Sequence, residues 1–202
     1  MGLCFTFDFE ATKAALLYLA SRDLPRFDKY RASKLLFLAD REHLLRFGRP
    51  ITGDSYSALP YGPTPNRVLC LLDGLEKVTL EGADPASDEV AELAKHFDVF
   101  EDEYSTYHAR SGVDLDSLSK SDMKVLDDVI EEHGRKTFNE LKTLTHNMKA
   151  YTNVWRTGEI CRKFPMTFED FFAEAPDKAD FLKELKENHE LRQAFPEDVV
   201  CA

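Results

Sequence analysis

The sequence predicts a mainly α-helical domain that also carries a short β-hairpin or a small antiparallel sheet. Apolar residues recur at the three- and four-residue spacing of helices over most of the 202 residues. Between residues 51 and 65 this spacing gives way to a segment rich in glycine, proline and tyrosine. Further along, aromatic residues flank Glu101-Asp102-Glu103 in the pattern of a hairpin. We therefore expect helices interrupted by two short β elements.

The first two helices are predicted from their caps and apolar stripes. Asp8 can cap a helix over residues 9–21, in which alanines and Tyr18 form one buried stripe. A second helix over residues 28–47 is apolar on several faces, which predicts a central place in the core. Gly48 is placed to end this helix, because glycine readily adopts the left-handed conformation found at helix ends.

A short β element should follow the second helix. Residues 56–59 can form an extended strand before a tight turn, which Gly62 and the neighbouring prolines fix. Thr64 is expected to cap a third helix, with Pro65 at its first position and an end near Thr79.

The middle of the chain is expected to contain the hairpin and two more helices. An acidic linker leads into the hairpin, formed by residues 96–100 and 104–109. A helix should run from Ser121 to about Gly134. Thr137-Phe138-Asn139-Glu140 has the spacing of a capping box and should start a short helix.

We expect a main domain over residues 1–156 and a helical C-terminal extension over residues 157–202. Tyr151 and Trp155 should lie in helical turns near the end of the main domain. The extension should contain a charged, amphipathic helix over about residues 177–195 and should pack on the domain or contact a partner.

The net charge of −11 comes from one part of the chain. Residues 83–132 contain 15 acidic and 4 basic residues, whereas residues 22–49 contain 8 Lys or Arg and 4 Asp or Glu. Such a surface favours a basic protein partner and weighs against nucleic acid, because nonspecific binding to nucleic acid depends on basic residues that neutralise phosphates. A solvated acidic face without a partner is the alternative.

Composition also bears on location and cofactors. The sequence has no apolar run near the roughly 20 residues that cross a bilayer, and residues 1–10 lack the pattern of a secretion signal. The 4 cysteines are scattered without a disulfide or metal-binding pattern. We therefore expect a cytoplasmic protein with no membrane partner, no metal and no other cofactor.

The common motifs of nucleotide-binding enzymes, metalloproteases and serine hydrolases are missing from the sequence. The best catalytic candidates are Asp40 and His43 on the second helix, with His146 from elsewhere, since a carboxylate beside an imidazole can serve as an acid/base pair. A buried structural histidine explains the same pattern and is favoured. We therefore expect no enzymatic activity, and a hydrolase built on Asp40 and His43 is the alternative.

Several motifs follow one another in a characteristic order. They are Lys34-Leu35-Leu36-Phe37-Leu38-Ala39-Asp40, the glycine-containing residues 48–54, Tyr61-Gly62-Pro63, and a leucine-rich helix with Leu141, Leu144, Thr145 and His146 followed by Trp155. In order and spacing these motifs resemble the SocA-like antitoxin family, whose domain is also called the Panacea domain. The resemblance covers roughly residues 6–156.

The resemblance implies an antitoxin that binds and neutralises a toxin protein encoded beside it. Such a type II toxin-antitoxin pair would be bacterial or carried by a phage or prophage, with a role in phage defence as one option. The implied partner is the cognate toxin, and no cofactor is implied. The candidate partner-binding residues are Lys34, Asp40, His43, Asp54, Tyr56, Tyr61, Gly62, Pro63, His146 and Trp155.

Two other roles remain open. Some family members resemble proteolytic adaptors that deliver the toxin to an ATP-dependent protease, and the apolar residues 199–202 suit that role. A DNA-binding autoregulator is supported only by the basic stretch over residues 22–49. The sequence also leaves open whether the chain forms a homo-oligomer or a hetero-oligomer with the toxin.

Overall fold

The computed structural model describes the chain except residues 1, 102, 111–113, 159–162, 177 and 195–202 and the side chains of residues 178 and 188–194. The described part contains eight α-helices, one short 3₁₀ helix and two small antiparallel sheets. The predicted fold class, mainly helical with a minor antiparallel β component, is therefore confirmed.

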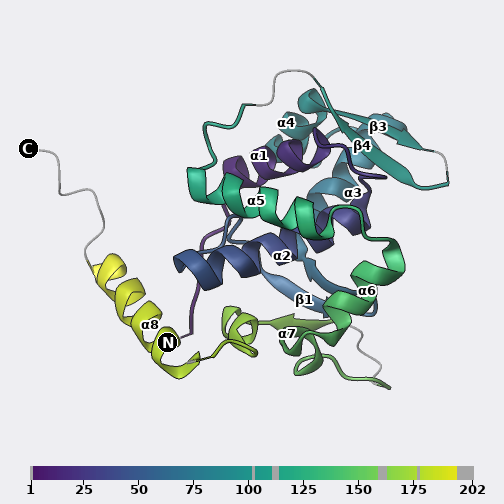
Figure 1. Ribbon diagram of the computed structural model, residues 1–202. Helices are drawn as coiled ribbons and strands as arrows, with labels where there is room; N and C mark the ends of the chain where they lie inside the picture. Colours follow the sequence, from purple (N-terminus) through teal and green to yellow (C-terminus); the bar gives the residue numbers. More distant parts are fainter. Residues whose placement is uncertain (1, 102, 111–113, 159–162, 177, 195–202) are drawn as a thin grey trace, which may run out of the picture.

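Helix α2 (Lys29–Phe47) lies at the centre of the fold. In Figure 1, α1 (Phe9–Ala20) and α5 (Lys120–His133) lie on one side of it, and strand β1 (Tyr56–Leu59) lies on the other. Because neighbours cover α2 from several directions, six of its apolar side chains have no exposed surface: Ala32, Leu35, Leu36, Phe37, Ala39 and Leu44. The prediction of a central helix is confirmed.

The predicted caps of α1 and α2 are present. The side chain of Asp8 accepts a hydrogen bond from the backbone N–H of Ala11 (2.9 Å), and Asp28 does the same for Arg31 (2.7 Å). Gly48 ends α2 with φ 74°, in the left-handed region that favours glycine. Both helices therefore begin and end within one residue of their predicted bounds.

A three-stranded antiparallel sheet packs below α2, in the order β2-β1-β5. Strand β1 was predicted, and β2 (Gly62–Pro65) forms the hairpin with it. Strand β5 (Phe164–Met166) was not predicted, because its three residues are too few to show an alternating pattern and contain Pro165. Proline is tolerated there because β5 is an edge strand. It pairs with β1 on one side, and no strand on its other side requires a hydrogen bond from a backbone N–H.

Helix α3 (Asn66–Leu80) begins one residue later than predicted, and its expected cap was wrong. Thr64 and Pro65 belong to β2, and Thr64 Oγ1 bonds to the carbonyl oxygen of Gly62 (3.2 Å) instead. The acceptors at the start of α3 come from Asp54, which lies more than ten residues earlier in the sequence. A cap supplied by a distant residue leaves no local sequence signal.

The predicted acidic linker contains a helix, α4 (Asp88–His96), which the sequence reading missed. Ser87 caps it by accepting a hydrogen bond from the N–H of Val90 (3.3 Å). Only Val90 and Leu93 are buried in this helix, so its apolar pattern is too sparse to stand out among the acidic residues. The hairpin that follows, β3 (Phe97–Glu101) and β4 (Ser105–Ala109), is confirmed.

The chain then forms α5 and α6 (Phe138–Asn147), and the capping box predicted at Thr137 is present with Glu140. Helix α7 (Lys149–Thr152) is a single turn that contains Tyr151. Trp155 lies after α7 and outside any helix, so its predicted helical conformation is wrong.

Residues of the C-terminal extension contribute to the core. The 3₁₀ helix η1 (Phe168–Phe172) places the side chains of Phe171 and Phe172 in the hydrophobic core, with 1% and 0% of their surface exposed. The last helix, α8 (Lys178–Ala194), projects away from the body in Figure 1. Its first turns still contact the domain, since Phe181 packs on Phe172 with ring centroids 5.5 Å apart.

Candidate functional site

The turn between β1 and β2 is fixed from below by a buried lysine. Lys34 of α2 has 1% exposed surface, and its Nζ donates a hydrogen bond to the carbonyl oxygen of Pro63 (2.7 Å). Burial lowers the pKa of Lys34 to about 7. Gly62 has φ 105°, and a Cβ there would lie 2.9 Å from Thr145 Oγ1 and 3.2 Å from Lys34 Cε. Glycine is therefore required at this position for both conformation and space.

Tyr61 stands on this turn with 59% of its surface exposed. Its ring lies 6.0 Å from the ring of Phe138, which is itself 41% exposed. The ammonium of Lys142 lies 5.3 Å from the Tyr61 centroid, within the range of a cation–π contact. The turn thus presents two large aromatic side chains and a cation to solvent.

Tyr61 belongs to a longer series of aromatic and imidazole rings, here called the aromatic row. It consists of Tyr30, Phe138, Tyr61, His146, Tyr151, Trp155 and Phe164. The row runs from the start of α2 across α6 and α7, which lie at the lower right of Figure 1, to β5. Six of its members are at least partly exposed, because only Tyr151 is buried. The tertiary structure therefore brings three predicted residues, Tyr61, His146 and Trp155, onto one surface.

His146 joins the two halves of the row. One ring nitrogen bonds to the backbone of Tyr61, and its Nε2 is buried without a hydrogen-bond partner among the described residues. Its ring also lies 4.5 Å from that of Tyr151. Burial, helped by the charges of Lys142 and Lys34, lowers the pKa of His146, which favours the neutral imidazole.

Asp40 holds the loop that precedes β1. Its carboxylate accepts hydrogen bonds from the backbone N–H groups of Ile51 (2.8 Å) and Thr52 (2.9 Å), from the Thr52 hydroxyl, and from the Tyr56 hydroxyl (2.9 Å). Asp40 has no exposed surface, and this burial raises its pKa although the hydrogen bonds act in the opposite direction. Asp40 and Tyr56 therefore act inside the fold.

Asp54 supplies the cap of α3. Its two carboxylate oxygens accept hydrogen bonds from the N–H groups of Arg67 (3.0 Å) and Val68 (2.9 Å). These are orphan donors of the first helical turn, and their positive partial charge suits a carboxylate. Burial raises the pKa of Asp54 to about 6. Like Asp40, this residue is completely buried and offers no atom to a partner.

His43 is paired with the carboxylate of Asp122, a contact that was not predicted from the sequence. Its Nε2 lies 2.9 Å from Asp122 Oδ1 and 3.1 Å from Ser121 Oγ, and its Nδ1 lies 2.7 Å from the carbonyl oxygen of Arg49. The prediction that His43 is a buried structural histidine is confirmed, and its hydrogen-bonding partners include an Asp side chain. The partner is Asp122 of α5, whereas Asp40 bonds elsewhere.

This geometry does not support the hydrolase alternative. In a serine hydrolase the acid and the serine occupy opposite nitrogens of the histidine ring. Here Ser121 and Asp122 share Nε2, and a backbone carbonyl occupies Nδ1. His43 has no exposed surface, so a substrate could not reach it without a rearrangement.

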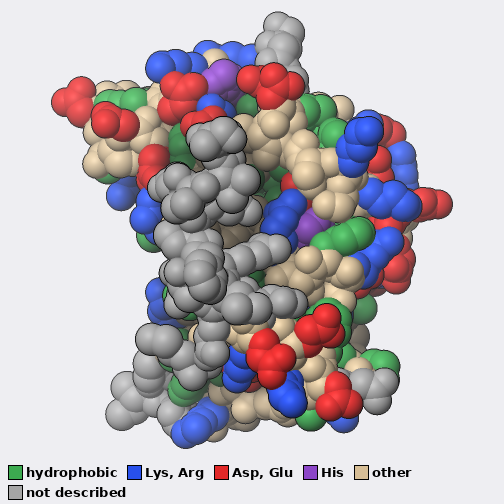
Figure 2. Space-filling model, turned by 90° about the vertical axis from the view of Figure 1, so that its left-hand side faces the viewer, with side chains coloured by type: hydrophobic (Ala, Val, Ile, Leu, Met, Phe, Trp, Pro, Cys, Tyr) green, Lys and Arg blue, Asp and Glu red, His purple; other side chains and the backbone are tan. Residues whose placement is uncertain are grey.

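The basic stretch over residues 22–49 does not present free cations for phosphates. Each of its eight Lys or Arg side chains already contacts an acceptor. The pairs are Arg22–Asp127, Arg26–Asp28, Lys29 with Asp73 and Glu76, Arg31 with the Gly134 carbonyl, Lys34 with the Pro63 carbonyl, Arg41–Glu174, Arg46–Asp128, and Arg49–Asp122. On the face shown in Figure 2, blue and red side chains are likewise intermixed.

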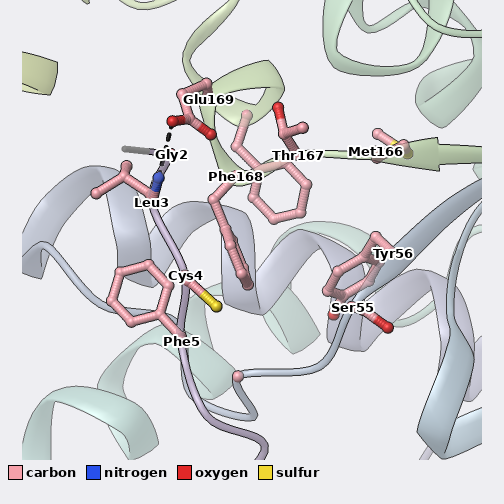
Figure 3. A pocket seen from close by; sticks show the side chains of 12 residues that line it. Gly2, Leu3, Cys4, Phe5, Ser55, Tyr56, Met166, Thr167, Phe168 and Glu169 are labelled. Atoms are coloured by element: carbon pink, nitrogen blue, oxygen red, sulfur yellow. Dashed lines mark hydrogen bonds between the residues drawn. The ribbon is translucent and has the colours of Figure 1, made fainter.

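A cavity of about 260 Å³ lies between the N-terminal segment, β1 and η1 (Figure 3). Its walls are mainly apolar, with Phe5 and Phe168 in edge-to-face contact at 4.9 Å. Glu169 at the rim accepts a hydrogen bond from the N–H of Leu3 (2.8 Å), drawn as a dashed line in Figure 3. A substrate site usually has several polar groups that converge on the ligand. This cavity lacks such a set among the described residues.

Among the described residues, no group of three or more His, Cys, Asp or Glu side chains could hold a metal ion. None of the helices in that part of the chain is long and apolar enough to cross a membrane.

The fold and the aromatic row define a mainly helical domain with a row of partly exposed aromatic side chains. The family model described as "Antitoxin SocA-like, Panacea domain" matches residues 33–151 of the chain. The chain belongs to this family, and the expected membership is confirmed. No curated protein and no solved structure shows significant similarity to the chain.

Family membership supports an antitoxin role in general and points to a regulator rather than an enzyme. The match begins at residue 33 within α2, includes the β1–β2 turn and α6, and ends at Tyr151. It therefore covers the lysine-supported turn and most of the aromatic row.

Proposed function

We propose that this chain is the antitoxin of a toxin-antitoxin pair and neutralises its toxin by binding it directly. The observation that carries direct binding is the exposed Tyr61 on a turn held in place by Lys34. Tyrosine is among the residue types that dominate binding energies at protein interfaces. A turn that is already ordered loses little conformational entropy when a partner binds.

The candidate residues divide into two groups under this proposal. Tyr61, His146 and Trp155 contact the toxin, while Lys34, Gly62 and Pro63 hold the turn that presents Tyr61. The remaining candidates stabilise the fold, because their side chains are buried and form hydrogen bonds within the chain. These residues are Asp40, His43, Asp54 and Tyr56.

The wider context is part of the proposal. The toxin is encoded next to this chain in a type II system, both proteins act in the cytoplasm, and neutralisation involves no enzymatic step or cofactor. A prophage location and a role in phage defence are options within the same proposal. The family supports these details only through the general antitoxin role.

Co-expression tests the proposal. Bacteria express the adjacent reading frame alone, with this chain, or with its Tyr61→Ala variant, and growth is measured before the two proteins are co-purified. We expect growth arrest by the neighbour alone, rescue by the wild-type chain and recovery of a complex. Rescue without a complex, accompanied by loss of the toxin, would instead indicate a proteolytic adaptor. If neither neighbouring reading frame is toxic, the antitoxin proposal is wrong.

A further inference from the structure

The aromatic row carries a local charge that differs from the charge of the whole chain. Residues 141–158 contain Lys142, Lys149 and Arg156 and no Asp or Glu, although the chain has a net charge of −11. This segment includes α7 and most of α6, which supply His146, Tyr151 and Trp155 to the row. The segment that supplies these rings is therefore basic, although Glu174 from the C-terminal part of the chain accepts a hydrogen bond from the backbone N–H of Lys149 (3.1 Å).

Lys142 is the cation placed most directly on this surface. Its ammonium lies 5.3 Å from the Tyr61 ring, and the described residues give it no carboxylate partner. The acidic residue closest to it in α6, Glu140, is used by the capping box, where it accepts hydrogen bonds from the backbone N–H (2.8 Å) and hydroxyl (2.8 Å) of Thr137. A cation that contacts an aromatic ring and has no carboxylate beside it is suited to receive one from a partner.

The other exposed aromatic side chains lie in different surroundings. Phe47 lies near the guanidinium of Arg46, but Arg46 is paired with Asp128. Tyr104 packs under Arg26, which is itself paired with Asp28. Phe100 lies on the hairpin next to Glu101, so an acidic segment would be repelled there. Charge therefore separates the aromatic row from the hairpin as a binding surface.

We propose that the aromatic row is the docking surface for an acidic segment of the toxin. Apolar side chains of that segment pack on Tyr61 and Phe138, and one of its carboxylates faces Lys142. This inference rests on the proposed function and adds the chemistry of the partner. The inference also differs from the expectation based on net charge. The acidic residues 83–132 favour a basic partner, whereas the aromatic row favours an acidic one.

Two variants with matched controls test the docking surface. The affinity of the purified full-length chain for the purified product of the adjacent reading frame is measured by calorimetry at low and high salt. Lys142→Glu is compared with Lys77→Glu, which makes the same charge change at an exposed position in α3. Tyr61→Ala is compared with Tyr104→Ala, because Tyr104 is similarly exposed at 55% on the hairpin.

We expect Lys142→Glu to raise Kd about tenfold at low salt and by less at high salt, because salt screens exposed charges. Tyr61→Ala should raise Kd by roughly tenfold or more, as is common for a central aromatic side chain. Both controls should stay within about twofold of the wild type. Suppose that the wild-type chain binds the toxin and rescues growth. If both test variants then have the Kd of the wild type, the proposed docking surface is wrong and the antitoxin function stands. A wild-type chain that neither binds nor rescues would overturn both.

Footprinting of the wild-type complex gives a second test, which does not depend on whether a variant folds. Hydroxyl radicals modify exposed aromatic side chains, and the rates are compared with and without the toxin. We expect several-fold slower modification of Tyr61 and Phe138 in the complex and unchanged rates at Phe100 and Tyr104. The opposite pattern would place the toxin on the hairpin and overturn the inference.

Discussion

At the scale of single residues, Asp122 shows how a charge is kept inside this protein. Only 3% of its side chain is exposed, and burial alone would raise its pKa. Hydrogen bonds from His43, Arg49 and Ser119 outweigh burial and hold the pKa well below its usual range. Asp122 thereby ties α5 to the end of α2 and the segment that follows it.

Replacement of this carboxylate should be costly. We expect Asp122→Asn to lower the free energy of unfolding by about 3 kcal/mol near pH 7, because it removes a buried carboxylate that accepts hydrogen bonds from Arg49 and Ser119 and contacts His43. The folded-state pKa is depressed, so the contribution of Asp122 is present above pH 4 and is lost as the pH falls below it. The difference between wild type and variant should therefore narrow from pH 4 to pH 2 in urea titrations.

A matched change at an exposed carboxylate provides the control for this experiment. Asp84 is exposed, so Asp84→Asn should alter the free energy of unfolding by less than about 0.5 kcal/mol at every pH. Equal effects of the two substitutions would contradict the role assigned to Asp122.

Lys34 gives the opposite dependence on pH. Its pKa of about 7 in the fold lies below its ordinary value of 10.5, so the unfolded chain binds one more proton between these values. The free energy of unfolding should therefore rise between pH 7.5 and pH 9, by up to about 1.4 kcal/mol per pH unit from this residue. Lys34→Met should remove that rise. A variant with the same slope as the wild type would show that Lys34 stays protonated in the fold.

At the scale of elements, the β1–β2 turn depends on close approach between three parts of the chain. Gly62 lies against Thr145 of α6 and Lys34 of α2, so the turn, the central helix and α6 are fixed together. A side chain at position 62 would push these elements apart. The orientation of Tyr61 toward solvent is therefore a property of the packing around the turn.

Two glycine substitutions separate space from backbone conformation. Gly62 and Gly82 both have positive φ, of 105° and 68°, but a Cβ at Gly82 would meet nothing within 4 Å. We expect Gly82→Ala to cost about 1 kcal/mol and Gly62→Ala to cost about 2–3 kcal/mol in the free energy of unfolding. Thermal and urea unfolding of the two variants would measure this difference. Equal costs would mean that the neighbours of Gly62 adapt freely.

At the scale of the whole molecule, the folding unit extends beyond the family match. The match ends at residue 151, yet β5 pairs with β1, and Phe171 and Phe172 are buried in the common core. Burial of a Phe side chain typically contributes about 2–3 kcal/mol, which is a large share of the stability of a small domain. We therefore expect the rest of the fold to require residues 164–172.

Truncation tests this conclusion. A chain of residues 1–158 loses β5 and η1, and we expect it to lack a cooperative thermal transition. A chain of residues 1–176 keeps both elements and loses α8, so it should unfold cooperatively at a lower Tm than the full chain. Circular dichroism and gel filtration would compare them. A cooperatively folded 1–158 fragment would support the expected domain boundary near residue 156.

Much of the helical architecture could be predicted because its signals are local. Asp8, Gly48 and Thr137 act on neighbours within a few residues, and the wide apolar surface of α2 directly reports its burial. Helix α4 and strand β5 were missed because their patterns are short and weak. The family motifs also identified the turn, although they did not distinguish exposed residues from buried ones.

The sequence by itself determined the helical class, the principal caps, the hairpin and the family, since each depends on spacing along the chain. Only the tertiary structure decided that Asp54 caps α3, that His43 pairs with Asp122, and that the basic residues near the start of α2 already contact acceptors within the chain. It also assembled the aromatic row from segments far apart in the chain. The physical reason is that partners of buried charges and members of a surface are chosen by packing in space.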